Sequence, residues 1–183
     1  MDRKAQIRAV LLPAAEQAFT ALFAAHPEHY YYCALLMLEC AAPCITAISE
    51  ESLARALEEA DSDAEEDRIY YKWSYAESPY TGFGYSEYFG AVEALFNQDI
   101  YDDDLSDAEY ERRIAEWLAV SADVMETLAQ KGVFGDRTDL FLNAEFQPPE
   151  DFANVENAQR LNSKALFDAW FAENGDEYEP EDS

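Results

Sequence analysis

The chain has 183 residues, which suits one domain, and 49% hydrophobic with 14% aromatic residues is enough for a folded core. It has 39 acidic and 12 basic residues, so its formal net charge is −27. Phosphate contacts need clustered Lys and Arg, and this balance therefore disfavours nucleic acid and anionic membranes as partners. A surplus of negative charge keeps a protein soluble and also attracts basic partners, and both explanations stay open at this stage.

The start of the chain carries no sign of a secretory signal, because Met1-Asp2-Arg3-Lys4 is not followed by a continuous apolar segment. The longest apolar run, from Tyr30 to Leu38, is too short to cross a bilayer. We therefore expect a cytoplasmic protein without a membrane partner.

Residues 2–25 are predicted to form a helix, because apolar side chains recur there at steps of three and four. Pro13 lies inside this pattern and predicts a kink or a new helix start. Residues 29–40 are apolar on both alternations, which is typical of a strand in the middle of a sheet. A turn at 41–43 and a neighbouring strand at 44–48 are expected to follow.

Helices and strands alternate without regular order in the rest of the chain. Ser49 is predicted to cap a helix that ends near Ala60. The alternation of aromatic and polar residues predicts a strand at 69–75, followed by a loop to residue 85. Further elements are predicted as helices at 86–97, from a cap at Ser106 to Gly132, at 151–161 and at 163–173, and as a strand at 140–146.

These elements predict an α+β fold in which helices flank a small, mostly antiparallel sheet. No internal repeat or domain boundary is found, so residues 1–175 are predicted to be a single acidic domain. Residues 176–183 are predicted to be an acidic, flexible tail.

The residues needed for catalysis are largely missing. His26 and His29 have Pro27 between them, which argues against one helical turn that could hold a metal. The three cysteines match no zinc signature, and we expect buried, reduced thiols at Cys33, Cys40 and Cys44. No Gly-rich phosphate loop occurs. We therefore expect no enzyme activity, no cofactor and no metal, with a carboxylate-based enzyme as the alternative.

The acidic residues gather beside aromatic ones. Seven of the ten residues from Glu58 to Asp67 are acidic, and a second cluster starts at Asp99. Tyrosines anchor interfaces, and acids steer a basic partner from a distance. The alternative is that the tyrosines cover the sheet while the acids are merely solvated. The residues predicted to bind a partner are Tyr80, Tyr85, Tyr101, Asp102, Asp103, Asp104, Glu65, Glu66 and Asp67.

Several short segments match the pattern of one family. They are His26-Pro27-Glu28-His29-Tyr30-Tyr31, Ser49-Glu50-Glu51-Ser52-Leu53, Lys72-Trp73-Ser74, Lys131-Gly132-Val133-Phe134-Gly135 and Arg160-Leu161-Asn162. With these segments, which span nearly the whole chain, the sequence resembles the bacterial domain-of-unknown-function family 4303. The family resembles one without assigned catalytic residues, so the resemblance assigns no catalytic role to any residue of this chain.

Some small acidic proteins of this kind accompany secreted antibacterial toxins as immunity proteins, which is an argument from analogy. We therefore expect an acidic protein-binding module, an immunity protein that neutralises a basic cognate toxin by direct binding. The alternative is a regulatory or scaffolding protein that has no toxin partner.

Overall fold

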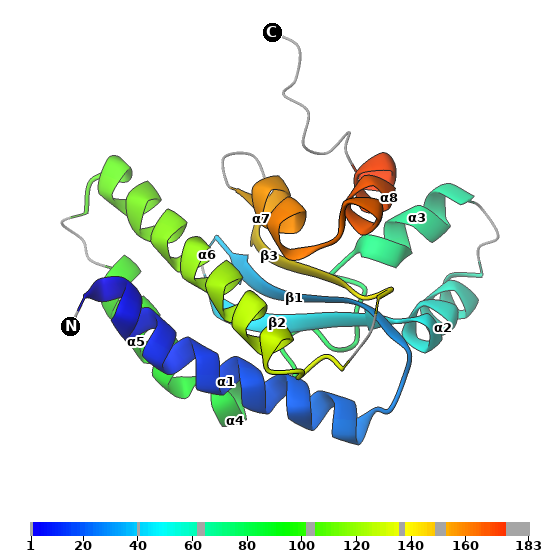
Figure 1. Ribbon diagram of the computed structural model, residues 1–183, viewed down its shortest axis with the longest axis horizontal. Coiled ribbons are helices and arrows are strands. Elements are labelled where there is room, and N and C mark those ends of the chain that lie inside the picture. Colours follow the sequence, from blue (N-terminus) through cyan, green and yellow to red (C-terminus); the bar gives the residue numbers. More distant parts are fainter. Residues whose placement is uncertain are drawn as a thin grey trace, which may run out of the picture.

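The computed structural model describes residues 2–39, 41–61, 65–101, 105–135, 138–148 and 153–174, without the side chains of Glu65 and Glu66. Three strands form one sheet with helices on both faces (Figure 1). The central strand β1 (Tyr30–Leu38) pairs antiparallel with β2 (Ala41–Ser49) and parallel with β3 (Phe141–Gln147). The predicted α+β domain, with a mostly antiparallel sheet and flanking helices, is confirmed; the antiparallel ladder is the longer of the two.

The central position of β1 is also confirmed. Residues 31–37 are buried throughout, because helices cover both faces of the sheet. The turn predicted at 41–43 is wrong, since these residues begin β2. The turn was predicted from Pro43. Strand β2 lies at the edge of the sheet, and an edge strand tolerates a proline because one of its sides needs no hydrogen-bond donors.

One face of the sheet is covered by α1 (Arg3–Ala25), α4 (Tyr85–Tyr88), α5 (Gly90–Ile100) and α6 (Asp107–Gln130), with α1 and α6 side by side (Figure 1). Helix α1 continues through Pro13, so the alternative of a new helix start does not occur. Pro13 is exposed, and water can therefore bind the carbonyl that the proline leaves unpaired. By length and composition α1 could cross a membrane, but it buries Ile7, Leu11 and Phe19 in the core cluster that includes Trp117 of α6.

The other face is covered by α2 (Glu50–Ala60), α3 (Glu65–Trp73), α7 (Asn154–Leu161) and α8 (Lys164–Asn174). The predicted cap of α2 is confirmed, because the Ser49 hydroxyl accepts a hydrogen bond from the Ser52 backbone N–H over 2.9 Å. The aromatic side chains between these helices and the sheet include Tyr31, Tyr32 and Phe141. This second core is smaller than the first.

The strand predicted at 69–75 is wrong, because residues 65–73 form helix α3 and residues 75–77 a turn. Short aromatic runs do not distinguish a strand from a helix. Three acidic residues, from Glu65 to Asp67, occupy the first turn of α3, where the helix dipole favours negative charge. That signal was available in the sequence and outweighs the β propensity of Tyr70 and Tyr71.

The remaining elements agree with the prediction in kind. The helix predicted at 86–97 is divided at Phe89 into α4 and α5. Ser106 caps α6, since its hydroxyl accepts from the Glu109 N–H over 3.3 Å. Cys33 is fully buried in β1 and Cys44 is partly buried in β2. Cys40 and the predicted tail lie outside the described residues.

Candidate functional site

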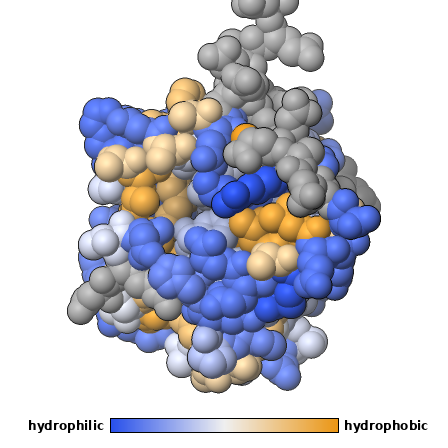
Figure 2. Space-filling view, turned by 90° about the vertical axis from the view of Figure 1, so that its right-hand side faces the viewer, coloured by the Kyte–Doolittle hydropathy of each residue, from blue (hydrophilic) through white to orange (hydrophobic). Residues whose placement is uncertain are grey.

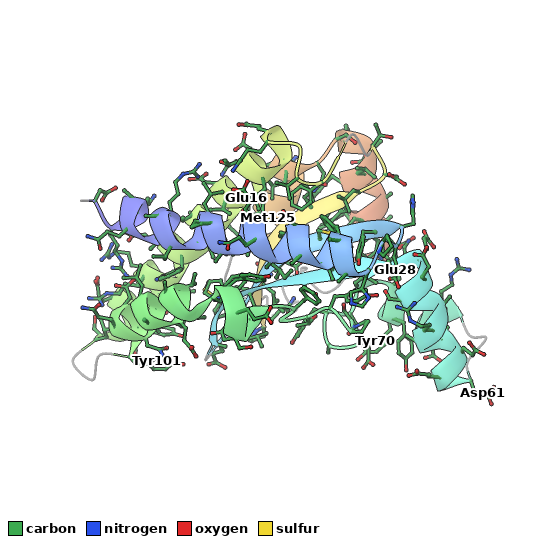
Figure 3. The ribbon with its side chains drawn as sticks, turned by 90° about the horizontal axis from the view of Figure 1, so that it is seen from below. Glu16, Glu28, Asp61, Tyr70, Tyr101 and Met125 are labelled. Carbon is green, nitrogen blue, oxygen red and sulfur yellow. The ribbon has the colours of Figure 1, made fainter. Side chains whose placement is uncertain are left out.

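The residues predicted to bind a partner lie in two separate regions. Tyr101 follows α5 at one end of the long axis, and its side chain is 56% exposed. Asp61, which belongs to the other acidic cluster, and Tyr70, which follows that cluster, lie at the opposite end (Figure 3). Asp102, Asp103 and Asp104 fall outside the described residues, as do the side chains of Glu65 and Glu66. The predicted residues therefore do not form one continuous surface.

Two of the predicted contact tyrosines belong to the interior. Tyr80 is 4% exposed, and its hydroxyl donates to Glu28 Oε2 over 2.7 Å. Tyr85 is half-buried and stacks on Phe89 with ring centroids 5.7 Å apart. Burial raises the pKa of Tyr85 to about 12. For these two residues the alternative interpretation, that tyrosines cover the core, fits the structure better.

Glu28 is the centre of a polar network that Tyr80 completes. Its carboxylate also accepts a hydrogen bond from Ser49 and forms an ion pair with Arg55, with Oε1 3.0 Å from Nη1. Burial alone would raise the pKa of Glu28, but the hydrogen bonds from these three partners outweigh it and lower the pKa. These contacts join segments that are far apart in the sequence, so the network stabilises the fold.

The acidic cluster from Glu58 to Asp67 forms a surface that we call the α2–α3 corner: the exposed residues Glu58, Glu59, Asp61 and Asp67. Glu58 and Glu59 lie in the last turn of α2, which contains no basic residue. A helix C-terminus carries partial negative charge, and each acid there costs about 0.3–1 kcal/mol. Helix stability therefore does not explain why this turn is acidic.

Helices α3 and α8 enclose a hollow that we call the α3–α8 cleft, with a volume of about 210 Å³. Figure 2 shows the face on which α2, α3 and α8 lie, where hydrophobic patches are separated by hydrophilic side chains. The cleft is lined by Tyr31, Glu50, Lys72, Trp73, Asp139, Phe141, Leu166, Ala169 and Trp170. It is an apolar hollow with a few polar groups, which is the usual composition of a binding site.

Aromatic rings form most of the cleft wall. Phe141 and Trp170 are stacked, with centroids 5.1 Å apart and planes 25° from parallel. Trp73 meets Phe141 edge-on at 5.9 Å and Tyr31 edge-on at 5.8 Å. Each of these rings is held by another ring, so the wall is preorganised.

The polar groups of the cleft are arranged around Lys72. Its Nζ lies 2.6 Å from Glu173 Oε2 and 4.8 Å from the centre of the Trp73 ring. Burial would raise the pKa of Glu173, but hydrogen bonds from Lys72 and Trp73 outweigh it and lower the pKa. The pKa of Tyr31 is raised, first by burial and then by the negative charges of Glu50 and Glu173. At the Tyr31 hydroxyl, these negative charges outweigh the positive charge of Arg68, which acts in the opposite direction.

His29, one of the two histidines considered as metal ligands, is at the rim of this cleft, where its Nε2 lies 2.8 Å from Asp139 Oδ2. His26 packs instead against Tyr80, with ring centroids 5.0 Å apart. Within the described ranges, no three His, Cys, Asp or Glu side chains are grouped to hold a metal ion.

Sequence reasoning did not find the α3–α8 cleft, because it predicted α3 as a strand. A signal was present, however. Tyr31, Glu50, Lys72 and Trp73 all belong to the short segments that carry the family resemblance. The topology brings these segments together from β1, α2 and α3.

Comparison with known proteins extends this picture at the level of the family. The family model described as Domain of unknown function (DUF4303) matches residues 11–163, which include every described strand and the cleft residues from Tyr31 to Phe141. No curated protein and no solved structure matches the chain. The match covers most of the sequence, and the chain therefore belongs to the DUF4303 family.

Proposed function

We propose that this chain is an acidic protein-binding module that acts as an immunity protein, neutralising a basic antibacterial toxin in the cytoplasm by direct binding. The observation that carries the proposal is the α2–α3 corner. Two of its acids, Glu58 and Glu59, occupy a helix end where they reduce stability, and Asp67 lies about one helical turn before Tyr70, whose side chain is exposed. A binding role explains both features, since acids speed association with a basic partner and tyrosine anchors the contact.

Several basic residues of the protein support this proposal because they pair with acids outside the corner. Lys72 pairs with Glu173, Lys131 with Glu16, and Arg160 with acids of α6. Glu58, Glu59 and Asp61 form no ion pair with any Lys or Arg that the structure describes. The negative charge of Glu58, Glu59 and Asp61 is therefore available to a partner.

A toxin that acts on nucleic acid would present Lys and Arg to phosphates. Carboxylates of the corner would occupy the same positions and block access to the substrate. Such an interaction is strongest at low salt and acts first on the association rate.

The test begins with capture of a stoichiometric partner from the native host and continues with the purified pair. Changing Glu58→Lys and Glu59→Lys together should slow association about tenfold, which corresponds to about 1.4 kcal/mol. The same pair of changes should leave the fold intact or stabilise it, because Lys suits a helix C-terminus.

Changing Glu179→Lys and Glu181→Lys is the matched control, since it alters the net charge equally. We expect this control to slow association less than the change of Glu58 and Glu59. We also expect the partner to lose its toxicity when the wild-type protein is present. An acidic partner, or equal effects of both double variants, would contradict the proposal.

A further inference from the structure

We propose that the α3–α8 cleft binds the guanidinium group of an arginine side chain that a basic partner presents. The biological source of the arginine rests on the proposed function. The chemistry of the cleft does not, and it can be measured without any partner.

The size of the cleft favours a single side chain. Sites for small molecules and cofactors usually enclose about 300–1,000 Å³. The α3–α8 cleft encloses about 210 Å³, so it is smaller than such a site. A side chain that enters from a partner needs only this limited space, because the rest of the partner stays on the surface.

The walls favour a flat cation. The stacked, nearly buried rings of Phe141 and Trp170 line the cleft together with Trp73, which meets Phe141 edge-on. Aromatic faces attract cations, and the planar guanidinium group stacks on them better than a compact ammonium group. The protein already uses this chemistry once, because Lys72 lies over the ring of Trp73 with Glu173 as its counter-ion.

The charges favour a cation as well. Glu50 is exposed at the cleft, and its carboxylate makes no hydrogen bond or ion pair within the described part of the chain. Asp139 contributes a second carboxylate, which is held by His29. The one lysine in the wall, Lys72, is already neutralised by Glu173. A guanidinium group can donate to carboxylates in pairs, and it would compensate Glu50.

The position of the cleft agrees with the α2–α3 corner. Helix α3 joins the two, with Asp67 near its start and Trp73 at its end. A helix of nine residues is about 13 Å long. A basic surface attracted by the corner can therefore place one arginine in the cleft.

The experiment uses the whole protein and N-acetyl-arginine amide as the probe. The protein has three tryptophans, of which Trp73 and Trp170 line the cleft and Trp117 is buried in the other core. The indole N–H signals of ¹⁵N-labelled protein therefore report on the cleft and contain an internal control. At low salt, the signals of Trp73 and Trp170 should shift and saturate with a dissociation constant in the millimolar range, roughly 1–10 mM. The Trp117 signal should not move.

The charge requirement is tested by substitution in the probe and in the protein. N-acetyl-citrulline amide has nearly the same shape without the charge and should produce no saturable shift. Glu50→Gln should weaken arginine binding about fivefold or more, whereas Glu87→Gln, in α4 on the other face of the sheet, should change it by less than about twofold. Both glutamates are exposed, so neither substitution should disturb the fold.

Three results would overturn the inference: no saturable shift, an equal response to citrulline, or a stronger response to N-acetyl-lysine amide. These failures are distinct from failure of the proposed function. If binding of the partner requires Glu58 and Glu59 but the protein does not bind N-acetyl-arginine amide, only the inference about the cleft is contradicted. Arginine binding without any basic partner would contradict only the proposed function.

Discussion

Trp73 of α3 donates a hydrogen bond from Nε1 to Oε2 of Glu173 in α8 over 2.7 Å. The same oxygen accepts from Lys72 Nζ over 2.6 Å. Helix α3 otherwise packs against α2, and α8 packs against α7. The carboxylate of Glu173 is therefore the direct polar link between the two helices that enclose the cleft.

Replacing Glu173 should loosen this link without unfolding the protein. We expect Glu173→Ala to lower the free energy of unfolding by about 1–2 kcal/mol, because two charge-assisted hydrogen bonds at a partly exposed site are lost. Chemical denaturation measures the loss. Amide hydrogen exchange should rise in α3 and α8 and stay unchanged in α1. The control, Asp168→Ala, removes only an exposed pair with Lys164 inside α8 and should cost less than about 0.5 kcal/mol.

The Glu28 network should control stability in acid. Because hydrogen bonds from Ser49, Tyr80 and Arg55 hold the folded-state pKa below 4.5, the unfolded state binds the proton more readily. The contribution to stability is therefore complete above pH 4.5 and is lost as the pH falls through the folded-state pKa. Glu28→Gln should cost about 1–3 kcal/mol at pH 7 and should flatten the decline between pH 5 and pH 3.

Urea unfolding at a series of pH values measures this effect. The control variant is Glu87→Gln, which removes an exposed carboxylate from α4. It should stay within about 0.5 kcal/mol of the wild type at every pH. An unchanged acid slope in Glu28→Gln would show that other carboxylates cause the decline.

Most elements that are marked by local sequence patterns were predicted correctly from the sequence. The burial of both faces of β1 and the caps at Ser49 and Ser106 are local patterns, and each was confirmed. Helix α3 was missed because its aromatic residues alternate as in a half-buried strand, and this alternation was given more weight than the three acidic residues of the first helical turn.

The candidate site depends still more on the tertiary structure. Tyr80 is buried and its hydroxyl donates a hydrogen bond to Glu28. The local pattern of tyrosines could not predict this contact, because the two residues are far apart in the sequence. The cleft likewise joins Tyr31, Trp73 and Trp170 from three distant segments. Composition indicated a basic partner, but the position of a surface that could bind it required the folded chain.

Cys44 should reduce stability in alkali. Burial raises its pKa to about 11 from the ordinary value of 9.0. Above pH 9 the thiol of the unfolded chain ionises while the folded thiol stays protonated, so stability is lost as the pH rises toward 11. Thermal melts from pH 8 to pH 11 should show this fall, and Cys44→Ala should make it shallower. If stability falls with pH as steeply in Cys44→Ala as in the wild type, the ionisation of tyrosines such as Tyr85, and not of Cys44, causes the fall.

Added salt should stabilise the protein. The net charge of −27 produces repulsion within the folded state, and salt screens it because the Debye length shortens from about 30 Å at 0.01 M to about 8 Å at 0.15 M. The melting temperature should therefore rise with moderate NaCl. A falling curve would mean that the surface ion pairs, such as Lys131 with Glu16, outweigh the repulsion.

Tyr101 and Asp61 lie at opposite ends of the molecule, so variants of the acidic residues near each of them in the sequence can show which end binds the partner. Changing Asp102, Asp103 and Asp104 all to Lys tests the cluster beside Tyr101, the exposed tyrosine at that end. If the partner binds the α2–α3 corner, this triple variant should slow association no more than a tail control in which Glu179, Glu181 and Asp182 become Lys. Association rates of the partner, measured at two salt concentrations, show which end of the molecule binds it. A tenfold loss in the triple aspartate variant would move the interface to the α5–α6 connection, and Tyr101→Ser should then speed dissociation, because tyrosine contributes contact area and not steering.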